Sequence, residues 1–256
     1  MKLVERAETD RVVVPAHVRI GTWNVNEAIA LGSGEDTLPE IVRIVREQRL
    51  DMLALQEVPF LGRSEVSPLF GPLLSETQLS HVAGHSLSPS YVRPGGRSGV
   101  VVASRFPLGE ITRAVLPNPG LVSDEMHSFD KGTVMARITL GGCGITLASV
   151  HMFPFHRFQR CAEEPEFSVV WDHLADEVSR CKDDVVVVAG DFNTDQRSLV
   201  LGRLAVPMES AITEGQVDDV LFGGARLVTV ATVPTSSDHP LCVAELDLTR
   251  EQVAAA

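Results

Sequence analysis

Residues 185–193 of the chain read VVVVAGDFN. A run of β-branched residues with no polar member is typical of a strand that is buried on both faces. Asp191 and Asn193 follow the run directly, so a rigid strand would hold a carboxylate and an amide at one edge of a sheet. Asp and Asn also favour turns, which is the alternative explanation of their presence here. We expect a buried strand at 185–189 with a chemically useful polar tip.

The same arrangement, an apolar run that ends in a polar residue, recurs on both sides of this stretch. Expected strands at 19–25, 51–57 and 144–151 end at or near polar residues, namely Asn24, Glu57 and His151. Later runs lie beside further polar residues, namely Asp218, Asp238 and His239. Strand ends present side chains to a shared cleft, where clustered carboxylates repel and need a cation or protons. Oxygen and amide ligands without cysteine favour Mg²⁺ or Mn²⁺ over structural zinc.

Helices and further strands complete the expected elements. Thr37 and Glu40 have the spacing of a capping box at the start of one helix, and regular apolar spacing predicts another over 168–181. Pro59 is expected to end the strand at 51–57. Residues 59–97 are expected to form loops around one short helix and one strand. The remaining expected strands cover 98–104, 110–116, 133–140, 217–222, 227–233 and 241–248.

Many strands with few helices among them predict an α+β protein, in which two packed sheets have helices on the outside. The sequence contains no linker, repeat or low-complexity segment, so we expect a single domain over 1–256 with its core at about 18–248. Hydrophobic residues make up 44% of the chain and charged residues 22%, which excludes wholesale disorder.

Composition also limits the partners and the compartment. The 22 Lys and Arg residues against 34 Asp and Glu residues give a net charge of −12, which argues against broad nonspecific nucleic-acid binding. No apolar run has the length of a transmembrane segment, and the first residues, 1–6, do not form a secretory signal. The four cysteines are widely spaced with no CxxC pair, which argues against a zinc ribbon and a disulfide scaffold and fits a reducing compartment. We therefore expect a cytoplasmic protein.

Several short motifs occur in an order that is specific in combination: Thr22-Trp23-Asn24-Val25, Leu55-Gln56-Glu57, Ser98-Gly99-Val100, Ser104-Arg105-Phe106-Pro107, Ser149-Val150-His151, Gly190-Asp191-Phe192-Asn193, Val217-Asp218 and Ser237-Asp238-His239. Together they resemble the endonuclease/exonuclease/phosphatase superfamily with the deoxyribonuclease-like fold. The resemblance covers residues 18–248, nearly the whole chain. It implies a four-layer α/β/β/α sandwich of two mixed β-sheets flanked by helices, with a metal cleft at one end.

The resemblance also implies a role for each motif residue. Glu57 would be the principal ligand of Mg²⁺ (or Mn²⁺), helped by Asn24 and completed by Asp238. The remaining residues would act on water and phosphate: Asp191 would orient or deprotonate the attacking water, Asn193 would bind phosphate or nucleophile, His239 polarised by Asp218 would contact the scissile phosphate, and His151 would donate to a phosphate oxygen or the leaving group. These roles meet the needs of phosphoester cleavage, which are an in-line water, charge neutralisation and protonation of the leaving oxygen.

Two positions leave alternatives open. Many relatives have Asp-His or Asp-Tyr where this chain has Asp218-Asp219, and we assign the family role to Asp218 because Val217 precedes it. Asp219 remains the alternative functional residue, or an added charge that alters metal or substrate preference. His151 could instead be a buried histidine with a structural role.

The segment directly after His151 is rich in phenylalanine and arginine. Phe155, Arg157 and Arg160 could form a substrate wall, in which arginine takes phosphate and the ring stacks on a base or covers an acyl chain. The alternative is a loop that packs its rings against the core. Arg97, at the start of a matched strand, is a further candidate for substrate contact.

We expect a divalent-metal-dependent phosphoesterase, and more narrowly a phosphodiesterase that acts on a compact phosphorylated substrate such as a nucleotide, a phospholipid headgroup or a small metabolite. The few aromatic residues, 5% of the chain, argue against an extended stacking groove. A DNA or RNA endo- or exonuclease is the alternative. A third class is the same fold recruited to a non-phosphate reaction, or a metal-binding scaffold without turnover. The sequence gives no information on oligomeric state.

Overall fold

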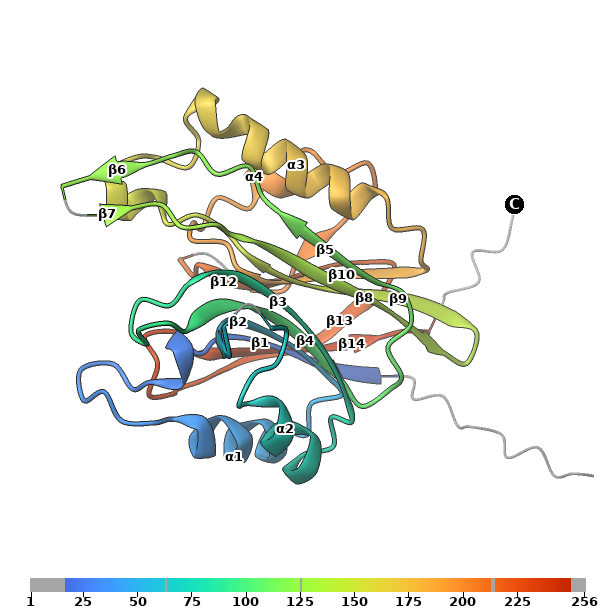
Figure 1. The fold of residues 1–256 in the computed structure, drawn as a ribbon. Coiled ribbons are helices and arrows are strands. Elements are labelled where there is room, and N and C mark those ends of the chain that lie inside the picture. The colour runs from blue at the N-terminus through green and yellow to red at the C-terminus, as the bar shows by residue number, and fades with distance from the viewer. Residues whose placement is uncertain (1–16, 63, 125, 213–214, 250–256) are drawn as a thin grey trace, which may run out of the picture.

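The computed structural model describes residues 17–62, 64–124, 126–212 and 215–249, so the expectation for residues 1–6 lies outside the described part. Two six-stranded sheets pack face to face, and helices cover the outer face of each sheet (Figure 1). The expected α+β sandwich of four layers is confirmed. Among the described residues, no helix has both the length and the apolar character needed to cross a membrane.

The first sheet has the strand order β13-β14-β1-β2-β4-β3. Its strands are β1 (His17–Asn24), β2 (Met52–Phe60), β3 (His81–Pro89), β4 (Arg97–Ser104), β13 (Arg226–Val233) and β14 (Leu241–Asp247). β1 and β2 run parallel, and the other neighbours run antiparallel. The carboxyl ends of β1 and β2 therefore lie at the same edge.

The second sheet has the strand order β11-β12-β10-β9-β8-β5. Its strands are β5 (Ile111–Val115), β8 (Gly132–Leu140), β9 (Cys143–His151), β10 (Val185–Asp191), β11 (Glu209–Ser210) and β12 (Asp218–Gly223). Here β9 and β10 are the parallel pair, so their last residues lie side by side. A two-stranded ribbon, β6 (Val122–Ser123) with β7 (Met126–His127), projects from the body of the molecule (Figure 1).

Three apolar clusters bind the layers together. The one between the sheets contains Ile20, Val102 and Val187, and the two outer ones lie under the helices. The helices α1 (Leu38–Gln48) and α2 (Phe70–Glu76) cover the first sheet, and α3 (Ser168–Ser179) and α4 (Ser198–Leu201) cover the second (Figure 1). Trp171 of α3 is 1% exposed, as expected for a core residue. Single-turn 3₁₀ helices are η1 (Asn26–Ala28), η2 (Phe155–Phe158) and η3 (Pro165–Phe167).

Two local expectations are wrong. Thr37 precedes α1, but its side chain makes no capping hydrogen bond; Asp36 Oδ1 accepts from the Leu38 amide instead, and Glu40 Oε1 accepts from the Ser236 amide. Pro59 does not end β2, which continues to Phe60. The pairing of β2 with β1 stops at Gln56, so the proline, which has no amide hydrogen, has no partner strand on its other side.

Candidate active site

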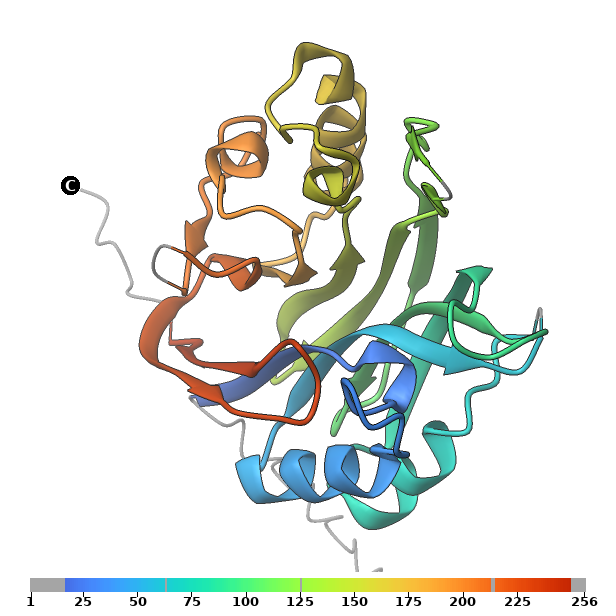
Figure 2. The same cartoon turned by 90° about the vertical axis from the view of Figure 1, so that its left-hand side faces the viewer.

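The polar strand ends meet at one end of the sandwich. Asp191 is paired with His151 of β9 in parallel and with Asp218 of β12 in antiparallel register. Asn24 is the last residue of β1, which runs parallel to β2 in the other sheet. Figure 2 faces this end, with η1 and the β6–β7 ribbon toward the viewer. Gly190 is required for this pairing, because a Cβ atom there would lie 2.0 Å from the Val150 carbonyl oxygen.

A β-bulge directs Glu57 toward the site. Leu55 pairs with Val101 and Val58 with Gly99, so two residues of β2, Gln56 and Glu57, face one residue of β4. Leu55 and Val58 consequently point to the same helix-covered face, and Glu57 has a left-handed φ of 51°. In a regular strand Glu57 would share the face of Leu55. The extra residue places the carboxylate on the site side instead.

A polar pocket of about 170 Å³ forms where these ends meet. Seven of the residues predicted from the sequence line it, namely Asn24, Glu57, His151, Asp191, Asn193, Asp238 and His239. Asp218 lies directly behind His239. The structure therefore brings together the eight predicted metal-ligating and catalytic residues. Asn26, Tyr91, Lys131, Pro154 and Arg157 complete the lining.

Asp191 is at the centre of the pocket and is 1% exposed. Its Oδ2 accepts from Asn24 Nδ2 at 3.0 Å and lies 3.4 Å from His151 Nε2 and 3.8 Å from His239 Nε2. Its Oδ1 accepts from the Asn193 amide at 2.8 Å. Asn193 has a left-handed φ of 53° and donates its side-chain amide to the Met152 carbonyl, which fixes the turn after β10. The carboxylate is thus held firmly while one oxygen faces the pocket.

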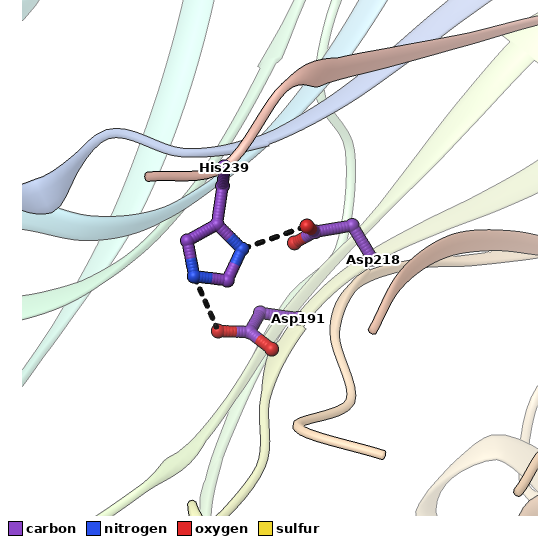
Figure 3. A group of neighbouring side chains, drawn as sticks. All are labelled: Asp191, Asp218 and His239. Atoms are coloured by element: carbon purple, nitrogen blue, oxygen red, sulfur yellow. Dashed lines mark hydrogen bonds and ion pairs between the residues drawn. The ribbon is translucent and has the colours of Figure 1, made fainter. Parts of the chain in front are cut away.

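His239 and Asp218 form a hydrogen-bonded pair, with 2.7 Å between His239 Nδ1 and Asp218 Oδ2 (Figure 3). Burial alone would lower the pKa of His239, but the hydrogen bond to Asp218 and the charge of Asp191 raise it to about 9. Burial raises the pKa of Asp218 to about 6 against the opposing effect of His239. At neutral pH His239 is therefore a cation whose Nε2 faces the pocket.

Asp219 takes no part in this pair, which decides between the two adjacent aspartates. It forms a buried ion pair with Arg197, with 2.6 Å between Oδ2 and Nε. It also accepts hydrogen bonds from the Ser210 hydroxyl and the Ile212 amide. Asp218 is the partner of His239, as assigned from the sequence.

His151 is buried next to Lys131, a residue that sequence reasoning missed. Lys131 Nζ lies 2.9 Å from His151 Nε2, and both side chains are buried. Burial lowers the pKa of both groups, and the lysine charge lowers the pKa of His151 further, so this imidazole is neutral. A positional signal existed: β8 runs antiparallel to β9 with Gly132 opposite His151, so the residue that precedes β8 must lie at the site edge.

The proposed substrate wall is only partly present. Arg157 lines the pocket. Phe155 does not reach it; the ring is 1% exposed and packs against Phe167 at a centroid distance of 4.4 Å. Arg160 is also directed elsewhere, because it forms ion pairs with Glu164 and Glu166. The predictions of substrate contact for Phe155 and Arg160 are therefore corrected: Phe155 packs in the core, and Arg160 is engaged in ion pairs.

Arg97 does not line the pocket either. Its guanidinium donates to Ser86 Oγ and to the Leu87 carbonyl oxygen of the neighbouring strand β3. These bonds hold the edge of the first sheet and leave the side chain part-buried against it. The predicted substrate contact of Arg97 is therefore corrected to a structural role as well.

The donor set fits a hard divalent cation. Asn24, Glu57, Asp191 and Asp238 offer carboxylate and amide oxygens, and no cysteine of the described residues lines the pocket. Glu57 Oε1 lies 3.7 Å from His151 Nε2, and Asp218 Oδ1 is buried without a donor among the described residues. Ligand atoms of Asp191, Asp218 and His239 also lie within 4.8 Å of one another (Figure 3). His239 is protonated at neutral pH, however, and an imidazolium does not ligate a metal.

Comparisons with known proteins agree with this architecture. The model of the endonuclease/exonuclease/phosphatase family matches residues 21–239. A search of curated proteins gave no significant match. An endonuclease/exonuclease/phosphatase from Beutenbergia cavernae shares 20% identity at a TM-score of 0.68, over 93% of this chain and 73% of that one.

Two further solved structures share the fold. ANGEL2, a 2′,3′-cyclic phosphatase, is 12% identical with a TM-score of 0.65, over 91% of this chain and 95% of that one. Humanized TDP2 from D. rerio is 14% identical with a TM-score of 0.60, over 91% and 99%. At such identities these likenesses concern the fold.

Proposed function

The chain belongs to the endonuclease/exonuclease/phosphatase family, and we propose that it is a divalent-metal-dependent phosphodiesterase for a compact phosphate ester. The observation that carries the proposal is the pairing of opposite charges in one polar pocket. The Asp191 carboxylate lies 3.8 Å from the cationic His239. An activated water and a developing negative charge on phosphate need such a pair of groups.

Each pocket residue has a role that follows from its position. Asp191, held by Asn24 and Asn193, orients the attacking water and takes its proton. His239 binds a phosphoryl oxygen through Nε2, because Asp218 engages its Nδ1 and keeps the ring charged. His151, neutral beside Lys131, donates a hydrogen bond at the leaving oxygen.

A divalent cation would be held by Glu57 with Asn24 and Asp238. When bound there, it supplies Lewis-acid polarisation of the phosphoryl group. The protein residues position the substrate around it, and Arg157 at the rim adds a guanidinium that suits phosphate oxygens. Mg²⁺ and Mn²⁺ are the expected ions, since the donors are oxygen atoms.

The compact substrate is favoured by the small polar pocket and the net charge of −12, which does not suit a long polyanion. Plasmid nicking at rates above those for small diesters, with a steep salt dependence of binding, would favour a nuclease instead.

The test is hydrolysis of bis-p-nitrophenyl phosphate by the purified protein with Mg²⁺ or Mn²⁺. We expect EDTA to abolish turnover and Asp191→Asn to lower kcat by about 100-fold or more, because the base is lost. Asp195→Asn, a nearby exposed carboxylate, is the matched control and should retain wild-type activity. Turnover that survives both EDTA and Asp191→Asn contradicts the proposal.

A further inference from the structure

A second pocket, of about 190 Å³ and lined mostly by apolar atoms, lies beside the candidate active site. One wall is Tyr91, on the loop after β3, and another is the segment 126–129, which includes β7. The third wall is formed by residues around η2. Tyr91, Pro154 and Arg157 line both pockets, so a molecule with its phosphate in the polar pocket would extend directly into the apolar one.

The walls of this apolar pocket are built from rings. Tyr91 and Phe129 meet edge to face at a centroid distance of 4.7 Å, and His127 lies 4.7 Å from Phe129 on another side. Arg157 is at the boundary with the polar pocket. Aromatic faces and a guanidinium are the groups on which flat, uncharged rings stack.

The Tyr91 wall is held in place by η1, which follows β1 of the same sheet. The Glu27 carboxylate is buried and accepts from the Tyr91 amide at 3.1 Å and from the Ser90 hydroxyl, while Arg93 donates to the Glu27 carbonyl at 3.1 Å. Asn26, Glu27 and Ala28 have left-handed φ values of 45°, 54° and 56°. Such a strained turn persists only where surrounding contacts fix it. The pocket is therefore preformed, which lowers the cost of binding.

We propose that this apolar pocket binds a flat, uncharged ring that the substrate carries next to its phosphate, with the chemistry of a nucleobase or an aryl group. The inference rests on the proposed function, since the phosphate must occupy the polar pocket. The volume favours one ring system: drug-sized ligands take pockets of ~300–1,000 Å³, and this one measures 190 Å³. It is too small for the paired acyl chains of a phospholipid.

The test compares two ligands that differ only in the ring, AMP and ribose 5-phosphate, by titration calorimetry on the full chain with Mg²⁺. Stacking predicts that AMP binds about 10-fold or more tightly. Phe129→Ala should reduce this ratio toward one, because it removes a ring of the wall. Val169→Ala, an exposed apolar residue of α3, is the matched control and should leave the ratio unchanged.

If Phe129→Ala does not fold, Met126→Ala replaces it, because the Met126 side chain is well exposed and its removal should leave the fold intact. Met126 lines the apolar pocket, so this variant should also lower the ratio of the two affinities. A comparison of phenyl phosphate with methyl phosphate distinguishes an aryl group from a nucleobase. If phenyl phosphate gains as much affinity over methyl phosphate as AMP gains over ribose 5-phosphate, the ring is an aryl group. A smaller gain in affinity indicates a nucleobase. Equal binding of AMP and ribose 5-phosphate overturns the inference, as does tighter binding of hexyl phosphate than of phenyl phosphate. These binding measurements need no turnover. A failure of the ring-binding inference is therefore distinguishable from a failure of the proposed activity, which the experiment with EDTA and Asp191→Asn detects.

Discussion

Two adjacent aspartates of β12, Asp218 and Asp219, are both buried but differ in how many hydrogen bonds their carboxylates accept. Asp219 is fully buried and satisfied: Arg197, Ser210, Ile212 and Val220 all donate to it. Asp218 is equally buried, but the only hydrogen bond of its carboxylate within the described residues is to His239, and its Oδ1 has no donor. We call Asp219 and its four donors the Asp219 cluster, and we call Asp218 with His239 the site cluster.

The difference shows what a buried carboxylate is used for. A satisfied ion pair fixes structure, since removal of one partner strands the other in the core. Arg197 also lies over the Phe192 ring at 5.1 Å, so the Asp219 cluster holds the turn that follows Asp191. A carboxylate with few donors can still use its negative charge to interact with a proton, a cation or a substrate. The site cluster thus contains a buried carboxylate with an unsatisfied oxygen, and the Asp219 cluster stabilises the neighbouring turn.

The largest expected effect breaks the Asp219 cluster. Asp219→Ala leaves Arg197, whose side chain is 12% exposed, without its counter-charge. We expect the free energy of unfolding to fall by about 3–5 kcal/mol, measured by urea denaturation. Asp195→Ala, at an exposed position, should change it by less than about 0.5 kcal/mol. Equal stability of the two variants would show that the buried pair contributes nothing.

The second effect breaks the site cluster. Asp218→Asn removes the charge that keeps His239 protonated, so we expect kcat at neutral pH to fall about 100-fold. Stability should fall far less than in Asp219→Ala, because the carboxylate that is removed is itself destabilised by burial. Paired kcat and urea measurements on both variants test this division. A result in which Asp218→Asn loses stability and retains activity would reverse the two assignments.

The third effect is a pH dependence of stability. His239 has a pKa of about 9 in the fold against 6.5 ordinarily, because the Asp218 hydrogen bond and the Asp191 charge outweigh the effect of burial. A raised pKa adds stability that is complete below pH 6.5 and lost as the pH rises to 9. In EDTA, wild type should lose stability relative to His239→Gln across this window. Parallel stability curves would exclude the charged pair.

The smallest effect concerns two arginines close in sequence. Arg157 lines the pocket and Arg160 is bound to Glu164 and Glu166. We expect Arg157→Ala to raise KM about 10-fold, the value of one charge-assisted hydrogen bond. Arg160→Ala should leave KM unchanged. An equal rise in both variants would mean that general charge, and not contact with the substrate, attracts the ester.

Strand ends were the features that the sequence predicted best. Apolar runs that end in Asn24, His151 and Asp191 predict the meeting of these residues, because parallel neighbours bring their carboxyl ends to one edge. The motif order identified the family and the two-sheet fold. The expectation of one domain remains a prediction.

Other features depend on contacts between distant segments. Lys131 carries no motif and is identified only by the pairing of β8 with β9. The left-handed turn at residues 26–28 contains no glycine, so nothing local predicts it. Glu40 could form a capping box with Thr37, yet it bonds to the Ser236 amide. Phe155 and Arg160 lie in a promising segment, but a strand pattern does not determine which residues of a following loop turn inward.

The bulge in β2 makes residue count, and not only residue identity, a determinant of chemistry. The alternation of faces is reset between Leu55 and Val58, so two adjacent residues serve the same side of the sheet: Gln56 donates to Ser149 Oγ of the opposite sheet, and Glu57 lines the pocket. A strand with one residue fewer here would place only one of these two side chains on that side, either the buried link between the sheets or the carboxylate of the site. Relatives that keep an acid at this place should keep the same spacing.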